Sequence, residues 1–137
     1  MPQTWLLKTE PSTYSFADLQ RDKRTVWDGV KNPQALKNLS QVKPGDRLLI
    51  YHTGNEKAVV GVATALAAAY PDPKKNDPRL LVIDLAPVAA LPRAVTLAEF
   101  KANSAFKGWE LVRLPRLSVM PVSAAHWAEI ERMAKRS

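Results

Sequence analysis

Residues 27–33 read Trp-Asp-Gly-Val-Lys-Asn-Pro, and the predicted fold can be built outward from this stretch. Gly29 permits backbone angles that a β-carbon disfavours. Pro33 suits the first turn of a helix, so Asn32 is expected to be the helix N-cap. The stretch is therefore predicted to be an ordered loop that ends by starting a helix. Loops held by a rigid scaffold often carry binding residues.

The same stretch combines a flat aromatic ring with a planar amide. The Trp27 indole offers a face for stacking, and the Asn32 amide offers both a donor and an acceptor. A pocket for an unpaired nucleobase needs both kinds of group. The alternative is that Trp27 is a core aromatic and Asn32 only a helix cap, because large apolar residues are usually buried.

The composition indicates one soluble domain. The chain has 137 residues, which suits a single domain over residues 1–137 with a real core. It has no cysteine, which excludes disulfides, cysteine-ligated zinc and a thiol nucleophile. The first residues do not form a signal-peptide pattern, and no apolar run could span a bilayer. A cytoplasmic location is expected.

The charge balance is basic. Twenty Lys and Arg residues oppose thirteen Asp and Glu residues, a net charge of +7. Residues 101–137 alone carry seven basic and three acidic side chains, net +4. A basic surface favours polyanions, and nucleic acid is the commonest polyanion. The alternative is that the charge serves solubility alone.

Alternation of apolar residues and turn chemistry predict several strands and short helices. Ser15, Thr96 and Ser123 are expected to be helix N-caps. The second and third strands should pair as antiparallel neighbours, and the proline-rich residues 70–78 should form a surface connection. The pattern favours an α+β fold with a small barrel rather than a doubly wound sheet. The expected strands are 3–9, 47–53, 58–69, 79–86 and 116–120, and the expected helices are 16–22, 33–41, 95–101, 103–110 and 124–135.

Several common chemistries have no motif in this sequence. There is no glycine-rich phosphate loop, no metalloprotease histidine spacing and no Gly-x-Ser-x-Gly elbow. A binding module without catalysis, cofactor or metal is therefore expected. One alternative is a nucleotide-modifying enzyme that uses Glu10 or Asp28 as base and His52 as acid. Another is a regulatory domain for a nucleotide or small acidic metabolite, which a weak salt dependence of binding would reveal.

Seven sequence motifs occur in order over nearly the whole chain, and each is weak alone. Together they closely resemble the EVE domain. Two positions differ from the family pattern, with Lys31 where arginine is usual and Thr53 where serine is usual. Lysine keeps the charge of arginine but loses its bidentate fork. The motifs are Trp5–Pro11, Tyr14–Leu19, Trp27–Asn32, Gly45-Asp46 with Tyr51–Gly54, Val60–Ala63 with Tyr70–Pro73, Arg116–Val122, and Trp127 with Ile130.

The resemblance implies a PUA-like fold, a small and mostly antiparallel β-barrel with short helices around its rim. It is similar to the YTH domain, whose aromatic cage holds a methylated adenine. It also implies a function, because EVE domains read modified bases in DNA or RNA, notably cytosines such as 5-methylcytosine or 5-hydroxymethylcytosine. The expected partner is therefore nucleic acid carrying a modified base. We expect a monomer or weak dimer.

The resemblance and the residue chemistry together suggest roles for particular side chains. Trp27 would stack on the flipped base, and Asn32 or the backbone near Gly29 would read its edge. Lys8 and Glu10 share one face of the first strand. Both could reach the pocket, or they could form an ion pair on the surface. The candidate ligand-binding residues are Lys8, Glu10, Tyr14, Ser15, Trp27, Gly29, Val30, Asn32, His52, Thr53, Pro71, Asp72, Arg116 and Ser118.

Several of these residues could instead have a purely structural role. Ser15 could be only a cap, Pro71 and Asp72 only a turn, and His52 only a packed histidine. Trp5 and Trp127 are expected in the core. Lys31, Lys74, Lys75 and Arg113 are expected to follow the nucleic-acid backbone, or else to form a solvated charged face.

Overall fold

A computed structural model of the chain describes residues 2–135. Its strands form one sheet in the order β2-β6-β4-β3-β1-β7, and β5 pairs with β6 beside this path. The strands are β1 (Thr4–Thr9), β2 (Thr25–Trp27), β3 (Arg47–His52), β4 (Ala58–Ala65), β5 (Tyr70–Pro71), β6 (Leu81–Thr96) and β7 (Val119–Val122). The helices are α1 (Phe16–Asp22), α2 (Pro33–Leu39), α3 (Leu97–Ala102), the 3-10 turn η1 (Ser104–Phe106), α4 (Glu110–Arg113) and α5 (Ala124–Ala134).

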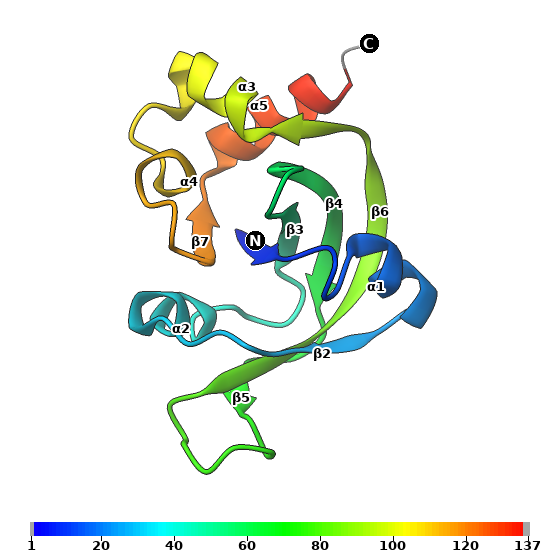
Figure 1. Cartoon of the computed structure of the whole chain (residues 1–137), viewed down its shortest axis with the longest axis vertical. Coiled ribbons are helices and arrows are strands. Elements are labelled where there is room, and N and C mark those ends of the chain that lie inside the picture. The colour runs from blue at the N-terminus through cyan, green and yellow to red at the C-terminus, as the bar shows by residue number, and fades with distance from the viewer. Residues whose placement is uncertain (1, 136–137) are drawn as a thin grey trace.

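The sheet is mixed and strongly curled. β1 and β3 run parallel, whereas the other paired strands are antiparallel. Figure 1 shows the sheet curving around the centre of the molecule, with the short helices arranged around its rim. The prediction of an α+β fold, with a mostly antiparallel barrel and helices at the rim, is confirmed.

The long strand β6 corrects the sequence prediction. The strand was expected to end at residue 86, but it continues to Thr96 through Pro87 and Pro92. Its pairing with β4 shifts register twice, and Pro87 lies at one of these shifts, opposite Ala63. Proline cannot donate to a ladder, so it is tolerated where the pairing is irregular. β6 pairs with β4 along most of its length, and its first residues also pair with β2 and β5.

Other element boundaries also differ from the predictions. The strand predicted over 58–69 ends at Ala65, and the strand predicted over 116–120 spans Val119–Val122 instead. The helix predicted over 103–110 is the short turn η1 followed by α4. Strands β2 and β5 were not predicted, because two or three residues carry no detectable alternation.

The predicted helix caps are confirmed. Ser15 and Thr96 each form a capping box, the first with Asp18. Asn32 accepts a hydrogen bond from the backbone N–H of Ala35, with Pro33 as the first helical residue. These local bonds fix where the helices begin. In particular, they fix the direction in which the chain leaves the loop at residues 28–32.

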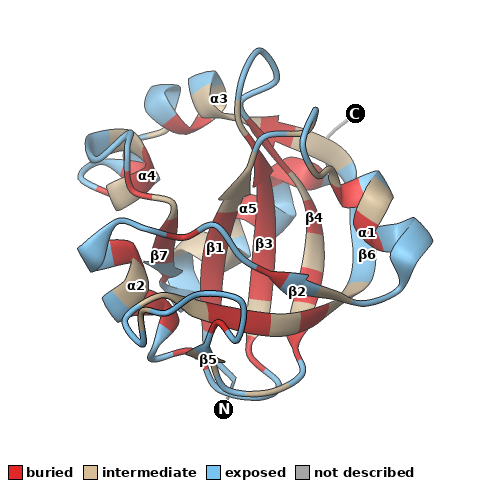
Figure 2. Cartoon of the chain, turned by 60° about the horizontal axis from the view of Figure 1, so that its bottom comes forward, coloured by how far each residue is buried: buried red, intermediate tan, exposed pale blue. Residues whose placement is uncertain are grey.

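The core lies along the central strands. Figure 2 shows buried residues concentrated on β1 and β3. Trp5 is in this core as predicted, and its indole N–H donates to the Asp46 carboxylate at 3.0 Å. Trp127 is only partly buried, and the Arg47 guanidinium lies 4.7 Å from its ring centre. The core prediction is therefore confirmed for Trp5 and holds only in part for Trp127.

Helix α1 is seated on the sheet through Phe16. A β-carbon built at Gly61 of β4 would lie 2.4 Å from the Phe16 ring, so the ring rests directly on the glycine backbone. The Phe16 backbone N–H also donates to Nε2 of the buried His52 at 3.0 Å. These two contacts fix the start of α1, and with it the loop that carries Tyr14.

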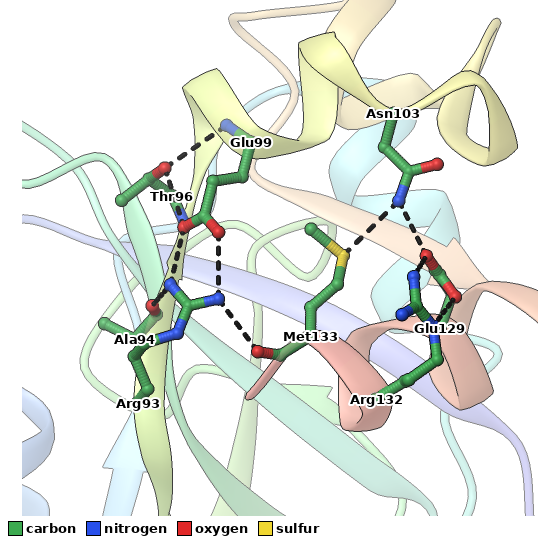
Figure 3. Close-up of polar contacts among 8 residues, drawn as sticks. All are labelled: Arg93, Ala94, Thr96, Glu99, Asn103, Glu129, Arg132 and Met133. Atoms are coloured by element: carbon green, nitrogen blue, oxygen red, sulfur yellow. Dashed lines mark hydrogen bonds and ion pairs between the residues drawn. The ribbon is translucent and has the colours of Figure 1, made fainter. Parts of the chain in front are cut away.

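A separate polar cluster connects the C-terminal part of β6 to two helices. Arg93 of β6 donates to both carboxylate oxygens of Glu99 at 2.9 Å and to the Met133 carbonyl of α5 at 2.8 Å (Figure 3). These contacts join β6, α3 and α5. The Arg93 guanidinium lowers the pKa of Glu99 to about 2.

Candidate functional site

A cavity of about 410 Å³ lies where β1 ends beside β2. Three separate segments line it, namely the end of β1, the loop before α1, and β2 with the two residues that follow. The lining residues are Lys8, Thr9, Thr13, Tyr14, Thr25, Val26, Trp27, Asp28 and Gly29. A cavity of this size is within the range of small-ligand sites.

Two aromatic residues form one wall of the cavity. The rings of Tyr14 and Trp27 meet edge to face, with centroids 6.2 Å apart and planes at 88°. Trp27 is 7% exposed, so its indole belongs to the core and also borders the cavity. Tyr14 is half-buried, its hydroxyl donates to Asp22 at 2.9 Å, and burial raises its pKa.

Charged and hydroxyl groups complete the lining. The Lys8 ammonium donates to the Pro115 carbonyl at 2.9 Å and lies 5.5 Å from the Tyr51 ring centre. Burial lowers the pKa of Lys8. Asp28 brings an exposed carboxylate to the cavity, and Thr9 donates to the Tyr14 carbonyl at 2.7 Å. The cavity therefore combines aromatic surface with a cation, an anion and hydroxyl groups.

Four of the sequence-predicted ligand residues meet in this cavity: Lys8, Tyr14, Trp27 and Gly29. Gly29 has a φ of +81°, as its predicted role in an irregular loop requires. Asn32 and Ser15 are engaged as helix caps, and Val30 is buried in the core. The cap interpretation of Asn32, an alternative in the sequence, thus matches its contacts.

His52 is buried and does not line the cavity. Its Nε2 accepts the Phe16 backbone N–H, so its Nδ1 carries the proton and donates to Glu56 at 2.7 Å. Both ring nitrogens are therefore occupied by structural bonds. The prediction that His52 binds the ligand does not match this placement, because its ring bonds to the start of α1.

Glu10 also serves the loops around the cavity. Its carboxylate accepts from the Ser12 backbone N–H, from the Ser12 hydroxyl and from Thr53. The Ser12 backbone bond is the main reason that the pKa of Glu10 is lowered. Lys8 bonds to the Pro115 carbonyl instead. Glu10 and Thr53 thus join the loop after β1 to the loop after β3.

The remaining candidates lie elsewhere. Pro71 ends β5, and Asp72 accepts the Lys74 backbone N–H in the turn that follows. Arg116 and Ser118 precede β7, so the prediction that they lie in a strand is wrong. The Ser118 carbonyl accepts the Lys8 backbone N–H at 3.0 Å, which places this segment beside β1.

The candidates for backbone contact lie in three separate segments of the chain. Lys31 lines a second cavity beside α2, and Lys74 and Lys75 are exposed in the loop between β5 and β6. Arg113 ends α4, and its Nε donates to the Gly108 carbonyl. The lining role of Thr25 and Val26 was missed, because it depends on the three-residue strand β2.

Residues 2–135 contain no cluster of three His, Asp or Glu side chains that could hold a metal ion. Within the same part of the chain, no helix combines the length and apolarity needed to cross a membrane.

Comparison with known proteins identifies the family. The EVE domain model matches residues 3–133. The chain belongs to the EVE domain family. The human relative thymocyte nuclear protein 1 is 28% identical over 153 residues, which cover 87% of this chain and 68% of that protein.

Solved structures of similar proteins share the whole EVE fold. A hypothetical protein from Leishmania major is 35% identical, with a TM-score of 0.91 and coverage of 98% of this chain and 96% of that chain. Human THYN1 protein in complex with DNA containing 5-methylcytosine is 26% identical, with a TM-score of 0.89 and coverage of 98% and 99%. The predicted family is therefore confirmed.

Proposed function

We propose that this EVE domain binds DNA that carries a modified cytosine, and that the cavity between β1 and β2 receives the flipped base. The observation that carries the proposal is the cavity itself, with Tyr14 and Trp27 on one wall and charged groups beside them. The structure of the human relative with DNA containing 5-methylcytosine supports the choice of ligand.

The energetics of base flipping are compatible with this cavity. Extracting a base from the stack costs a few kcal/mol. Contact with an aromatic side chain returns about 1–3 kcal/mol. Trp27 is held rigidly by the core, and Tyr14 is fixed by its bond to Asp22. The aromatic wall is thus preorganised, and binding does not have to order it.

The polar groups of the cavity match the edge of cytosine. The 4-amino group of cytosine is a donor, and an Asp carboxylate is a suitable acceptor for it. Asp28 supplies that carboxylate, and it would repel the O4 acceptor of thymine or uracil. Lys8 and the Thr13 hydroxyl can donate to the remaining acceptors of the base edge. These contacts select cytosine before any modification is considered.

Recognition of the modification requires an apolar contact. Val26 is half-exposed and lines the cavity, so it offers a surface for a 5-methyl group. One added methyl group gains only about 1–3 kcal/mol in a hydrophobic pocket. We therefore expect a preference for 5-methylcytosine of about ten-fold to a hundred-fold over plain cytosine.

We also propose that the domain binds without catalysis. The enzyme alternative needs Glu10 or Asp28 as base and His52 as acid. The supporting observation is that both nitrogens of His52 and both oxygens of Glu10 are already engaged in structural bonds. Unchanged oligonucleotide after prolonged incubation, checked by mass spectrometry, is the expected result. A new product would support the enzyme alternative.

The test compares short oligonucleotides that differ only at one cytosine. Plain, 5-methyl and 5-hydroxymethyl cytosine are presented in single- and double-stranded DNA and in RNA. Trp27→Phe removes indole surface but keeps a core aromatic, and Trp127→Phe is the matched control outside the cavity. We expect Trp27→Phe to weaken binding of the preferred oligonucleotide by about 3–10-fold, and Trp127→Phe to leave it unchanged.

Equal binding of all oligonucleotides by the unaltered protein would contradict the proposal. Unweakened binding of the preferred oligonucleotide by Trp27→Phe, in a variant whose fold is intact by circular dichroism, would place the ligand elsewhere. If the protein instead prefers the RNA oligonucleotides, the proposal of a base pocket stands and the nucleic-acid partner is RNA.

A further inference from the structure

A second cavity, of about 550 Å³, lies between α2 and the loop from β5 to β6. Its floor is apolar, because leucine and proline side chains from both segments meet there. Its rim carries three basic residues. The lining residues are Lys31, Pro33, Leu36, Lys37, Ser40, Asp77, Pro78, Arg79, Leu80 and Leu81.

The two lysines are the unneutralised charges of this rim. Arg79 donates to both carboxylate oxygens of Asp77 through Nε and Nη2, so that pair is nearly neutral as a unit. Lys31 and Lys37 are exposed, and neither forms an ion pair with any residue in the range 2–135. The rim therefore carries an excess of two positive charges over an apolar floor, which suits an anionic chain with apolar parts.

The second cavity adjoins the base cavity through one short loop. Asp28 and Gly29 line the first cavity, whereas Lys31 and Pro33 line the second. Two residues span at most about 7 Å between Gly29 and Lys31. Successive nucleotides of one stacked strand are separated by about 3.4 Å along the axis, and by more when the strand is extended. The nearest lining residues of the two cavities are thus at most about two nucleotides apart along a stacked strand.

We propose that this second cavity binds the phosphodiester backbone of the DNA strand, one or two nucleotides from the flipped base. The inference rests on the proposed function and adds the path of the flanking strand. Lys31 and Lys37 bind phosphate groups, and the floor around Leu36 and Leu80 supports the sugar. Figure 1 shows α2 and the loop beside β5 on the same side of the molecule, with β2 leading toward them.

The salt dependence of binding tests this path. The double variant Lys31→Gln, Lys37→Gln is compared with the unaltered protein on a single-stranded oligonucleotide with one 5-methylcytosine. Each phosphate contact contributes about 0.7 to the slope of log affinity against log salt on single strands. The double variant should lower that slope by about 1.4. Binding of the free nucleoside 5-methyl-2′-deoxycytidine, which has no phosphate, should not change.

Lys101→Gln, Lys107→Gln is the matched control. It removes the same charge from a separate surface hollow beside α3. Figure 1 shows α3 at the opposite end of the molecule from α2. We expect the control to leave the slope unchanged. An equal fall of the slope in both double variants, or no fall with Lys31 and Lys37 removed, would overturn the proposal.

The two proposals fail in different ways. If the unaltered protein does not prefer the modified oligonucleotide, the base pocket fails, while the slopes on plain DNA still decide the backbone path. If the modified base is preferred but the slope does not depend on Lys31 and Lys37, the backbone path fails and the base pocket stands. Absence of any DNA binding would overturn both.

Discussion

Replacing Glu99 with glutamine should loosen the attachment of the C-terminal helix α5. Arg93 holds both Glu99 oxygens and the Met133 carbonyl at once (Figure 3). Glutamine keeps the shape of the side chain but can offer only one acceptor oxygen to the guanidinium. The bidentate contact between Arg93 of β6 and residue 99 of α3 is then incomplete, and Arg93 loses its negatively charged partner.

The size of the effect follows from the pKa of Glu99. Hydrogen bonding to Arg93 is the main reason that this pKa falls from 4.5 to about 2 in the folded protein. A fall of this size in the pKa corresponds to about 3 kcal/mol. The side chains of Arg93 and Glu99 are 35% and 32% exposed, so solvent screens much of this energy. We expect Glu99→Gln to lower the free energy of unfolding by about 1–2 kcal/mol at pH 7.

The pH dependence has a defined sign. Because folding lowers the pKa of Glu99, its stabilisation is complete above the ordinary value of 4.5 and is lost as the pH falls toward about 2. The difference between the unaltered protein and Glu99→Gln should therefore shrink by more than half between pH 7 and pH 3. Urea unfolding followed by circular dichroism measures it at both values.

Glu131→Gln is the matched control, because Glu131 is exposed on α5 and the substitution makes the same change of charge. It should change the free energy of unfolding by less than about 0.5 kcal/mol. A Glu99→Gln variant as stable as the unaltered protein at pH 7 would refute the reasoning. So would a deficit that stays constant between pH 7 and pH 3.

Three further substitutions test other parts of the molecule. Asp46→Ala removes a buried carboxylate that accepts hydrogen bonds from the Trp5 indole and from two backbone N–H groups. The free energy of unfolding, measured in urea, should therefore fall by about 3–5 kcal/mol. A fall of less than about 1 kcal/mol would contradict this expectation. Gly61→Ala drives a β-carbon into the Phe16 ring and should cost about 1–3 kcal/mol, seen as a lower Tm; an unchanged Tm would show that the ring moves freely. Asp28→Asn should reduce discrimination between cytosine and thymine in oligonucleotide binding by about ten-fold; unchanged discrimination would remove Asp28 from the base edge.

Local chemistry made part of the fold predictable. The caps at Ser15, Asn32 and Thr96 depend on residues within one helical turn, so the sequence contains all the required information. The course of β6 beyond Pro87 depends on the bulged pairing with β4, which involves residues far away in the chain. No local sequence pattern encodes such pairing, and Pro87 therefore led to a predicted strand end that is too early.

The candidate site was likewise predictable only where local residue chemistry decides the structure. The loop around Trp27 and Gly29 was predicted from its residue types, and it does border the cavity with Tyr14 and Lys8. His52 was misplaced, because strand alternation does not reveal that its ring bonds to the start of α1. The residue types thus identified the cavity wall, while tertiary hydrogen bonds decided which polar groups were free to face a ligand.

The anchoring of the cavity wall limits how it can discriminate between bases. Lys8 is bonded to the Pro115 carbonyl, Tyr14 to Asp22, and Trp27 is packed in the core. These side chains are fixed before any ligand arrives, so a plain and a methylated cytosine meet the same walls. Selectivity for the methyl group must then come from the contact at its own position. Val26 is the half-exposed apolar side chain of the lining, which makes Val26→Ala the change that should weaken methyl preference most while leaving cytosine binding intact.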